Sequence, residues 1–176
     1  VLFPALGVMA EVIQTSTRRH LYGRTAVMVA MTIVAVLSFL VWGHHMFNTG
    51  INQDIRRVFT ITTIAISIPF DAIILSYIYS LAKGKVRVST PLLFVVGAIG
   101  VFIVGGITGV FLGSNALDYV LRGTYFVVAH FHYTMVGGGL LGLIAGLYYW
   151  YPKMTGRMFD EKLGRIHFVT ALIGYN

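Results

Sequence analysis

Histidines are the residues of this 176-residue sequence best suited to bind metals or react, and four of the six fall in two close pairs. His44 is adjacent to His45, and His130 is separated from His132 by one residue. On an α-helix, adjacent residues point ~100° apart and residues two apart point ~200° apart. His44 and His45 can therefore share one metal ion where the helix is locally distorted. His130 and His132 cannot, but they can bind two centres on opposite faces. Imidazole suits copper, iron and zinc, and haem iron commonly takes an axial histidine.

The composition predicts that these histidines lie in a membrane protein. Apolar residues make up 57% of the chain and charged residues 11%, whereas soluble proteins contain roughly 45–50% and 25%. So few charges cannot cover a water-facing surface, and disordered chains are polar and poor in aromatic residues. The absence of cysteine excludes disulfide frameworks, iron–sulfur clusters and thiol catalysis.

Four apolar segments are long enough to cross a bilayer core of ~30 Å, which needs ~20 helical residues. They are residues 25–47, 58–81, 92–112 and 124–151, and residues 1–17 and 166–176 have the character of partial spans. The sequence starts without a methionine and ends inside an apolar segment, so we expect it to be a piece of a longer chain. We predict an all-α polytopic transmembrane helix bundle, with residues 1–176 forming a single region.

The net charge of +7 does not predict nucleic-acid binding, because the basic residues form short clusters between the spans rather than one stripe. Alternating crossings place ten basic residues inside and three outside, a clear positive-inside bias. The inner ones are Arg18, Arg19, Arg24, Lys83, Lys85, Arg87, Lys153, Arg157, Lys162 and Arg165, and the outer ones are Arg56, Arg57 and Arg122. Both histidine pairs then lie in the outer half of the membrane, where they can meet around one site. Ionisable residues at such depth are functional candidates by default.

Five motifs carry a resemblance to subunit I of haem–copper terminal oxidases, and they occur in that family's order. They are Trp42-Gly43-His44-His45-Met46-Phe47, Gly105-Gly106-Ile107-Thr108-Gly109-Val110, Tyr125-Phe126-Val127-Val128-Ala129-His130-Phe131-His132-Tyr133, Tyr149-Trp150-Tyr151-Pro152-Lys153-Met154-Thr155-Gly156 and Ile166-His167-Phe168. The resemblance covers essentially the whole sequence. It implies a stretch from the end of family helix VI to the start of helix XI in a twelve-helix-type oxidase core.

The resemblance implies a distinct role for each histidine. His44 and His45 would be two of three ligands of the active-site copper. His130 would be the proximal ligand of the high-spin haem, His132 an axial ligand of the low-spin haem, and Phe131 would lie between the haems. The family's third copper histidine and its second low-spin haem ligand lie outside this sequence, which therefore cannot complete the site alone.

Two further residues match family positions near these centres. Trp42 would pack beside the copper histidines, and Asp118 would lie on the haem-propionate side, the alternative being an exposed carboxylate in an outer loop. The implied activity is reduction of dioxygen to water, coupled to proton uptake and translocation. The implied partners are membrane lipid, other oxidase subunits and a donor, which is a cytochrome c-like protein, a cupredoxin or quinol.

Several positions depart from the commonest family pattern. Ile73 stands where a lysine of the inner proton pathway is expected, with Phe70 and Ala10 in place of its threonine and serine. Arg122-Gly123 replaces a His-Asp pair that binds magnesium, so we expect no magnesium there. These departures favour a prokaryotic plasma membrane over a mitochondrial one.

An alternative polar line lies along residues 58–81. Thr60, Thr63, Ser67 and Asp71 are spaced by three and four residues, which places them on one helix face. Such a line can relay protons through water, or it can supply hydrogen bonds between helices.

Three other functions stay open from the sequence alone. A nitric-oxide reductase shares the histidine scaffold but holds non-haem iron, usually with carboxylate ligands. A non-catalytic haem-binding electron carrier and a transporter are the other two. Metal analysis separates them, because haem without copper favours the carrier and no cofactor favours the transporter.

Overall fold

The computed structural model describes residues 2–176, and these form helices joined by short turns, with no β-strand in that range. Val1, placed by the sequence in the first partial span, lies outside the described residues. The α-helices are α1 (Leu2–Thr17), α2 (Arg24–Leu40), α3 (Gln53–Ala65), α4 (Ser67–Lys83), α5 (Thr90–Gly113), α6 (Asn115–Leu121), α7 (Tyr125–Phe131), α8 (Leu141–Thr155) and α9 (Glu161–Tyr175). A 3₁₀-helix η1 (Trp42–Met46) continues α2, and a π-helix η2 (His132–Leu140) joins α7 to α8.

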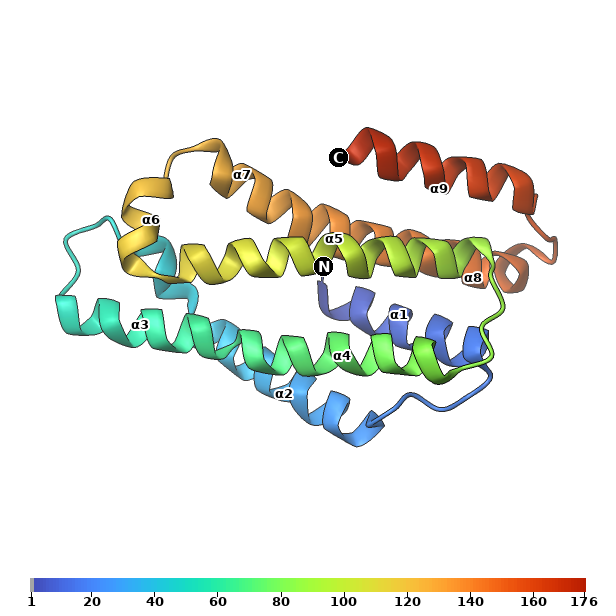
Figure 1. Cartoon of the computed structure of the whole chain (residues 1–176), viewed down its shortest axis with the longest axis horizontal. Coiled ribbons are helices and arrows are strands. Elements are labelled where there is room, and N and C mark those ends of the chain that lie inside the picture. Colours follow the sequence, from blue (N-terminus) through green and yellow to red (C-terminus); the bar gives the residue numbers. More distant parts are fainter. Residues whose placement is uncertain (1) are drawn as a thin grey trace.

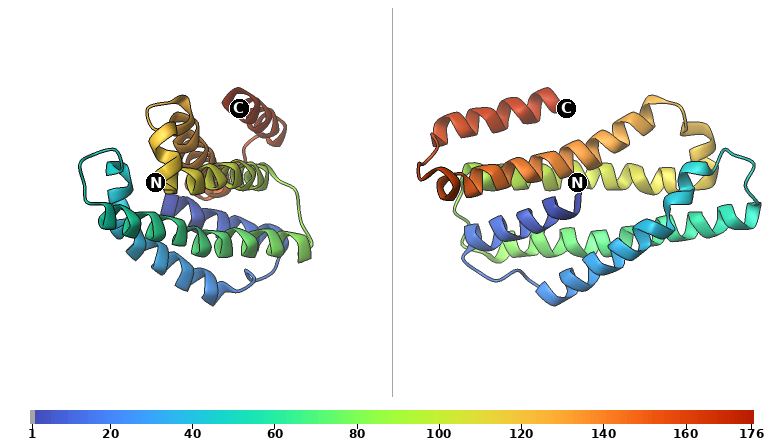
Figure 2. Two further views of the ribbon diagram at one scale, coloured as in Figure 1. Left: turned by 60° about the vertical axis from the view of Figure 1, so that its left-hand side comes forward. Right: turned by 180° about the vertical axis from the view of Figure 1, so that it is seen from behind.

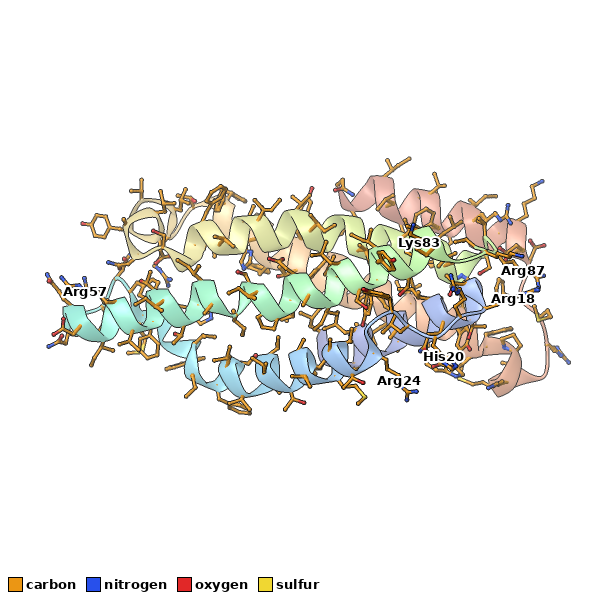
Figure 3. The ribbon with its side chains drawn as sticks, turned by 60° about the horizontal axis from the view of Figure 1, so that its bottom comes forward. Arg18, His20, Arg24, Arg57, Lys83 and Arg87 are labelled. Atoms are coloured by element: carbon orange, nitrogen blue, oxygen red, sulfur yellow. The ribbon has the colours of Figure 1, made fainter. Side chains whose placement is uncertain are left out.

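Four helical stretches of residues 2–176 are long and apolar enough to cross a membrane, namely Arg24–Met46, Gln53–Lys83, Thr90–Gly113 and Tyr125–Thr155. The prediction of an all-α polytopic bundle is therefore confirmed. The basic residues divide as the charge bias requires, because Arg18, His20, Lys83 and Arg87 lie toward one end of the molecule and Arg57 at the other (Figure 3).

Helix α5 occupies the centre of the bundle. In Figure 1 it runs between α7 on one side and α3 and α4 on the other, and Figure 2 shows from behind that α8 crosses it. The buried core joins α1, α4, α5 and α8, with Met9, Ile73, Val95 and Ala145 among its members. Lipid-spanning helices gain stability from such close packing and from hydrogen bonds between helices.

The predicted span 58–81 is interrupted in its middle. α3 ends at Ala65 and α4 begins at Ser67, with Ile66 between them. Pro69 explains the break, because proline has no N–H for the carbonyl four residues earlier and its ring collides with that carbonyl. The carbonyl that loses its donor is that of Ala65, and beside it the Ser67 hydroxyl donates to the carbonyl of Ile64 at 2.6 Å.

The predicted spans 25–47 and 124–151 also change helix type. The first tightens into η1 at Trp42, and the second widens into η2 at His132. π-Helical segments are rare and are often found at functional sites. Both changes fall on the histidine motifs, so the periodicity of a regular α-helix does not describe how these side chains point.

Glycines allow the π-helix to approach α5 closely. A Cβ atom on Gly105 would lie 2.9 Å from the backbone nitrogen of Thr134, and one on Gly138 would lie 2.6 Å from the ring of Phe102. Backbone atoms cannot move aside as a flexible side chain can. Gly105 therefore has to remain a glycine for α5 and η2 to touch.

We expect Gly105→Ala to destabilise the bundle by about 1–3 kcal/mol, as overpacking does elsewhere. Gly100→Ala, on the same helix, is the matched control because a Cβ atom there meets nothing within 4 Å. Thermal unfolding in detergent should show a lower Tm for the first variant alone. Equal Tm values for both would contradict the close-approach argument.

Candidate functional site

Three of the four paired histidines line one cavity of about 450 Å³. His44 and His45 reach it from η1, and His130 reaches it from the end of α7. The rest of the wall is mostly apolar, from α3, α4 and α5. The sequence expectation that the two pairs meet therefore applies to His130, whereas His132 is exposed and is not among the lining residues.

The two histidines of η1 turn their Nε2 atoms toward each other. These atoms lie 3.0 Å apart, and the Nδ1 atom of His44 lies 3.0 Å from the hydroxyl of Thr63 on α3. Two imidazole nitrogens that each lie ~2 Å from one ion can be at most ~4 Å apart. The observed spacing is within that limit. The pair can bind one metal ion through Nε2 while Thr63 orients His44 from behind.

The His130 ring is fixed from α5. Its Nδ1 lies 3.0 Å from the carbonyl oxygen of Gly105 and 3.2 Å from the hydroxyl of Thr108. A carbonyl only accepts, so Nδ1 carries the proton and donates it to Gly105, which leaves the Nε2 lone pair free. Metal-binding histidines are usually held in this way by a bond from the other ring nitrogen. A Cβ atom on Gly109 would lie 2.9 Å from Cε1 of His130, so that glycine leaves room for the ring.

His132 has the same tautomer but a different setting. Its Nδ1 lies 2.8 Å from the carbonyl oxygen of Val128, so Nε2 is again free. Its ring packs against Phe131, with centroids 4.6 Å apart. Neither Phe131 nor His132 lines the cavity that His130 lines. The arrangement suits two separate haem irons, one on each side of the α7–η2 junction.

Trp42 and Asp118, the two residues predicted near the histidine centres, differ in their position relative to the cavity. Trp42 is 65% exposed and does not line the cavity. Asp118 lines the cavity and is only 1% exposed, so the alternative of an exposed loop carboxylate does not apply. Its Oδ2 accepts from Nε of Arg122 at 2.6 Å. Residues Asn115–Leu121 form α6 instead of an open loop, and Asp118 is the buried residue of this helix.

The polar line along α3 and α4 is only partly assembled. Thr63, Ser67 and Asp71 line the cavity, but Thr60 does not. The hydroxyl of Thr60 is buried without a hydrogen-bond partner. The line therefore begins at Thr63, where it touches His44.

The positions of the expected lysine pathway are filled by packing. Ile73 is completely buried in the core, and Phe70 and Ala10 pack against that core. An apolar side chain neither carries a proton nor holds an ordered water. The described structure therefore offers no polar route through these three positions.

Residues 2–176 contain no group of three or more His, Asp or Glu side chains that could hold a metal ion. Within that range, His44 and His45 could supply two ligands to one ion if it displaced the hydrogen bond between their Nε2 atoms. His130 and His132 fit haem iron, because each presents a free Nε2 and has its Nδ1 bonded to a carbonyl oxygen.

Sequence reasoning missed two contacts of the site. Thr108 occurs in one of the five motifs, but nothing in its spacing indicates that it reaches His130 from another helix. The sequence indicates Arg122 only as an outer basic residue and as a replacement in a magnesium-binding pair. Its position four residues after Asp118 was a visible signal, since residues at that spacing meet on a helix.

The chain matches the family model described as "Cytochrome C and Quinol oxidase polypeptide I" over residues 1–176. It is 54% identical over 174 residues to the "Heme-copper oxidase subunit I+III" of Aeropyrum pernix, covering 99% of this chain and 21% of that protein. It is 42% identical to the "Cytochrome c oxidase subunit 1" of Thermostichus vulcanus, covering all of this chain and 32% of the relative.

A further relative is the "Quinol oxidase subunit 1" of Bacillus spizizenii, which is 40% identical over 176 residues, all of this chain and 27% of the relative. The chain thus spans between about a fifth and a third of the length of these curated relatives. Relatives named for cytochrome c and for quinol are almost equally similar, so identity does not separate the two donors.

We expect Thr63→Val to weaken metal binding by the His44–His45 pair about 10–100-fold, the usual effect of removing a group that orients a ligand. Thr62→Val is the control, because the Thr62 hydroxyl bonds only carbonyls of its own helix, those of Val58 and Phe59. Metal retained after dialysis against a chelator measures the difference. Equal retention by both variants would show that Thr63 does not orient the pair.

Proposed function

This chain belongs to the cytochrome c and quinol oxidase polypeptide I family, and on that basis we propose that it forms the core of the catalytic subunit of a respiratory terminal oxidase. The reaction is reduction of dioxygen to water. The observation that carries the proposal is the shared cavity, into which η1 brings His44 and His45 and α7 brings His130.

Each of these side chains has a separate task. His44 and His45 would hold copper through Nε2, with Thr63 orienting the first of them. His130 would hold the iron of the high-spin haem, and Gly105 and Thr108 fix its ring and its tautomer. His132 would hold the low-spin haem, with Phe131 packed beside it. When bound, the haems and the copper ion would supply the electron transfer to dioxygen.

The apolar wall of the cavity supports this assignment. Apart from the histidines and a few polar groups, the lining consists of residues such as Val41, Ile107 and Val110. Such a wall admits a small apolar molecule like dioxygen and limits the water that reaches the metals. A water-poor site also strengthens every electrostatic interaction inside it.

We assign proton delivery to the short polar line on α3 and α4. Asp71 and Ser67 line the cavity on the inner side of Thr63, whose hydroxyl reaches Nδ1 of His44. About eight residues of helix separate Asp71 from Thr63, or ~12 Å, so ordered water has to connect them. Burial of Ile73 in the core supports this route over the usual lysine position.

The protein would lie in a prokaryotic plasma membrane with other oxidase subunits. The similar proteins come from Aeropyrum, Thermostichus and Bacillus, and their names number them as subunits. Large apolar side chains such as Phe39 and Leu75 are exposed on the spanning helices, where lipid or the rest of the subunit would cover them. The names of the relatives support a cytochrome c-like protein or quinol as the donor, and a cupredoxin is the third candidate that the family resemblance implies.

Removing single histidines should separate the centres. His132→Ala should abolish the low-spin haem spectrum and leave copper bound, because His132 lies outside the copper cavity. His44→Ala should lose copper and oxygen reduction while keeping that spectrum. Copper and haem are measured on the same purified enzyme. Full copper and full turnover in His44→Ala would contradict the ligand assignment. Non-haem iron in place of copper in the parent enzyme would favour a nitric-oxide reductase.

Asp71→Asn should slow turnover roughly tenfold to a hundredfold, since a positioned proton donor contributes factors of this order or more. Ser67→Ala should have a milder effect, and haem and copper content should not change. Asp54→Asn is the control, because Asp54 is exposed and paired with Arg57 away from the cavity. Unchanged turnover in both Asp71→Asn and Ser67→Ala would show that these side chains serve helix packing and not proton delivery.

A further inference from the structure

We propose that Arg122 is a positioning residue that holds η1 in the orientation in which His44 and His45 meet one ion. This role rests on the proposed function, because it concerns the proposed copper ligands. It is carried by hydrogen bonds that join the C-terminal end of α6 to the backbone of the histidine pair itself.

Arg122 donates hydrogen bonds from all three nitrogen atoms of its guanidinium group. Nη1 donates to the carbonyl oxygen of His45 at 2.8 Å, and Nη2 donates to that of His44 at 2.9 Å. Nε donates to Oδ2 of Asp118 at 2.6 Å. The planar fork of arginine matches such a set of acceptors, because its donors lie at fixed angles. One side chain thus ties together two consecutive residues that present the facing Nε2 atoms.

Asp118, which accepts the hydrogen bond from Nε of Arg122, is itself buried and hydrogen-bonded through its backbone. The Asp118 side chain is only 2% exposed, and that of Arg122 is 29% exposed. The backbone nitrogen of Asp118 donates to Ser114 at 2.8 Å, and its carbonyl accepts from the backbone of Arg122 at 2.8 Å. A charge pair shielded from water is stronger than a surface pair and costs more to break. Arg122 is therefore held in place before it contacts η1.

The histidine pair needs such support because of where it lies. η1 has five residues and is followed by the turn at residues 47–52. The last carbonyls of a helix have no partner within it and carry partial negative charge. The His44 and His45 carbonyls are of this kind, so a cation that bonds both stabilises the end of η1. Without it, the backbone that orients both imidazoles would lose its outer contact.

A general structural contact and a positioning residue differ in what a conservative change does. Lysine keeps the positive charge but has one nitrogen, so it cannot bond two carbonyls and a carboxylate in a fixed plane. If Arg122 acts only through its charge and packing, Arg122→Lys should leave copper binding nearly unchanged. If the fork orients the histidines, Arg122→Lys should disturb the copper while the low-spin haem at His132, outside the cavity, is kept.

The test uses intact purified enzyme with Arg122→Lys, and Arg57→Lys as the matched control. Arg57 pairs with Asp54 at 3.3 Å, but both are exposed and neither lines the cavity. The readouts are copper lost to a chelator and the infrared stretching band of carbon monoxide moved onto cuprous copper by photolysis. We expect Arg122→Lys to lose copper about 10–100-fold faster and to show a shifted, broadened band. Arg57→Lys should match the parent enzyme in both.

The outcomes separate this role from the proposed function. An unchanged copper band and unchanged copper loss in Arg122→Lys would overturn the positioning role. Should that variant not accumulate, Arg122→Gln is measured in the same way. Loss of low-spin haem together with copper in the variant that is measured would also overturn the role. Copper kept by His44→Ala would instead contradict the proposed function.

Discussion

The close contact between α5 and the α7–η2 junction is the constraint on which the site depends. Gly105 permits it, because any Cβ atom there would meet the backbone of Thr134. The same residue supplies the carbonyl that fixes the His130 ring at 3.0 Å. One glycine thus couples the packing of the central helix to the tautomer of a proposed haem ligand. Gly109 repeats the pattern by leaving room for that ring.

Departures from α-helical geometry occur beside several cavity-lining residues, whereas α5 lines the cavity as a regular α-helix. η1 ends the span that carries His44 and His45, the break at Ile66 lies between Thr63 and Ser67, and η2 begins at His132. In a membrane such departures are tolerated only where other groups satisfy the freed backbone. Arg122 donates to two carbonyls of η1, and the Ser67 hydroxyl donates to the carbonyl of Ile64 beside the break. Irregular backbone and polar side chains therefore occur together for a common energetic reason.

The sequence predicted the all-α membrane bundle well, because long apolar segments and clustered basic residues are strong signals in a chain this poor in charge. It also predicted that both histidine pairs lie at comparable depth in the outer half of the membrane. It missed the break at Ile66, although Pro69 was its visible cause, and it missed the π-helix, which has no periodic signature of its own. The contacts of Arg122 with η1 and of Thr108 with His130 join residues far apart in the chain. Spacing along one helix cannot predict such contacts, because they depend on how helices pack.

Anomalous diffraction from crystals of the intact enzyme, recorded on both sides of the copper absorption edge, tests the central claim most directly. The account predicts a copper peak within coordination distance of the Nε2 atoms of His44 and His45, on the side of the cavity that faces His130. It predicts iron at Nε2 of His130 and, separately, at that of His132. A copper peak away from the His44–His45 pair, or iron at that pair, would contradict the assignment.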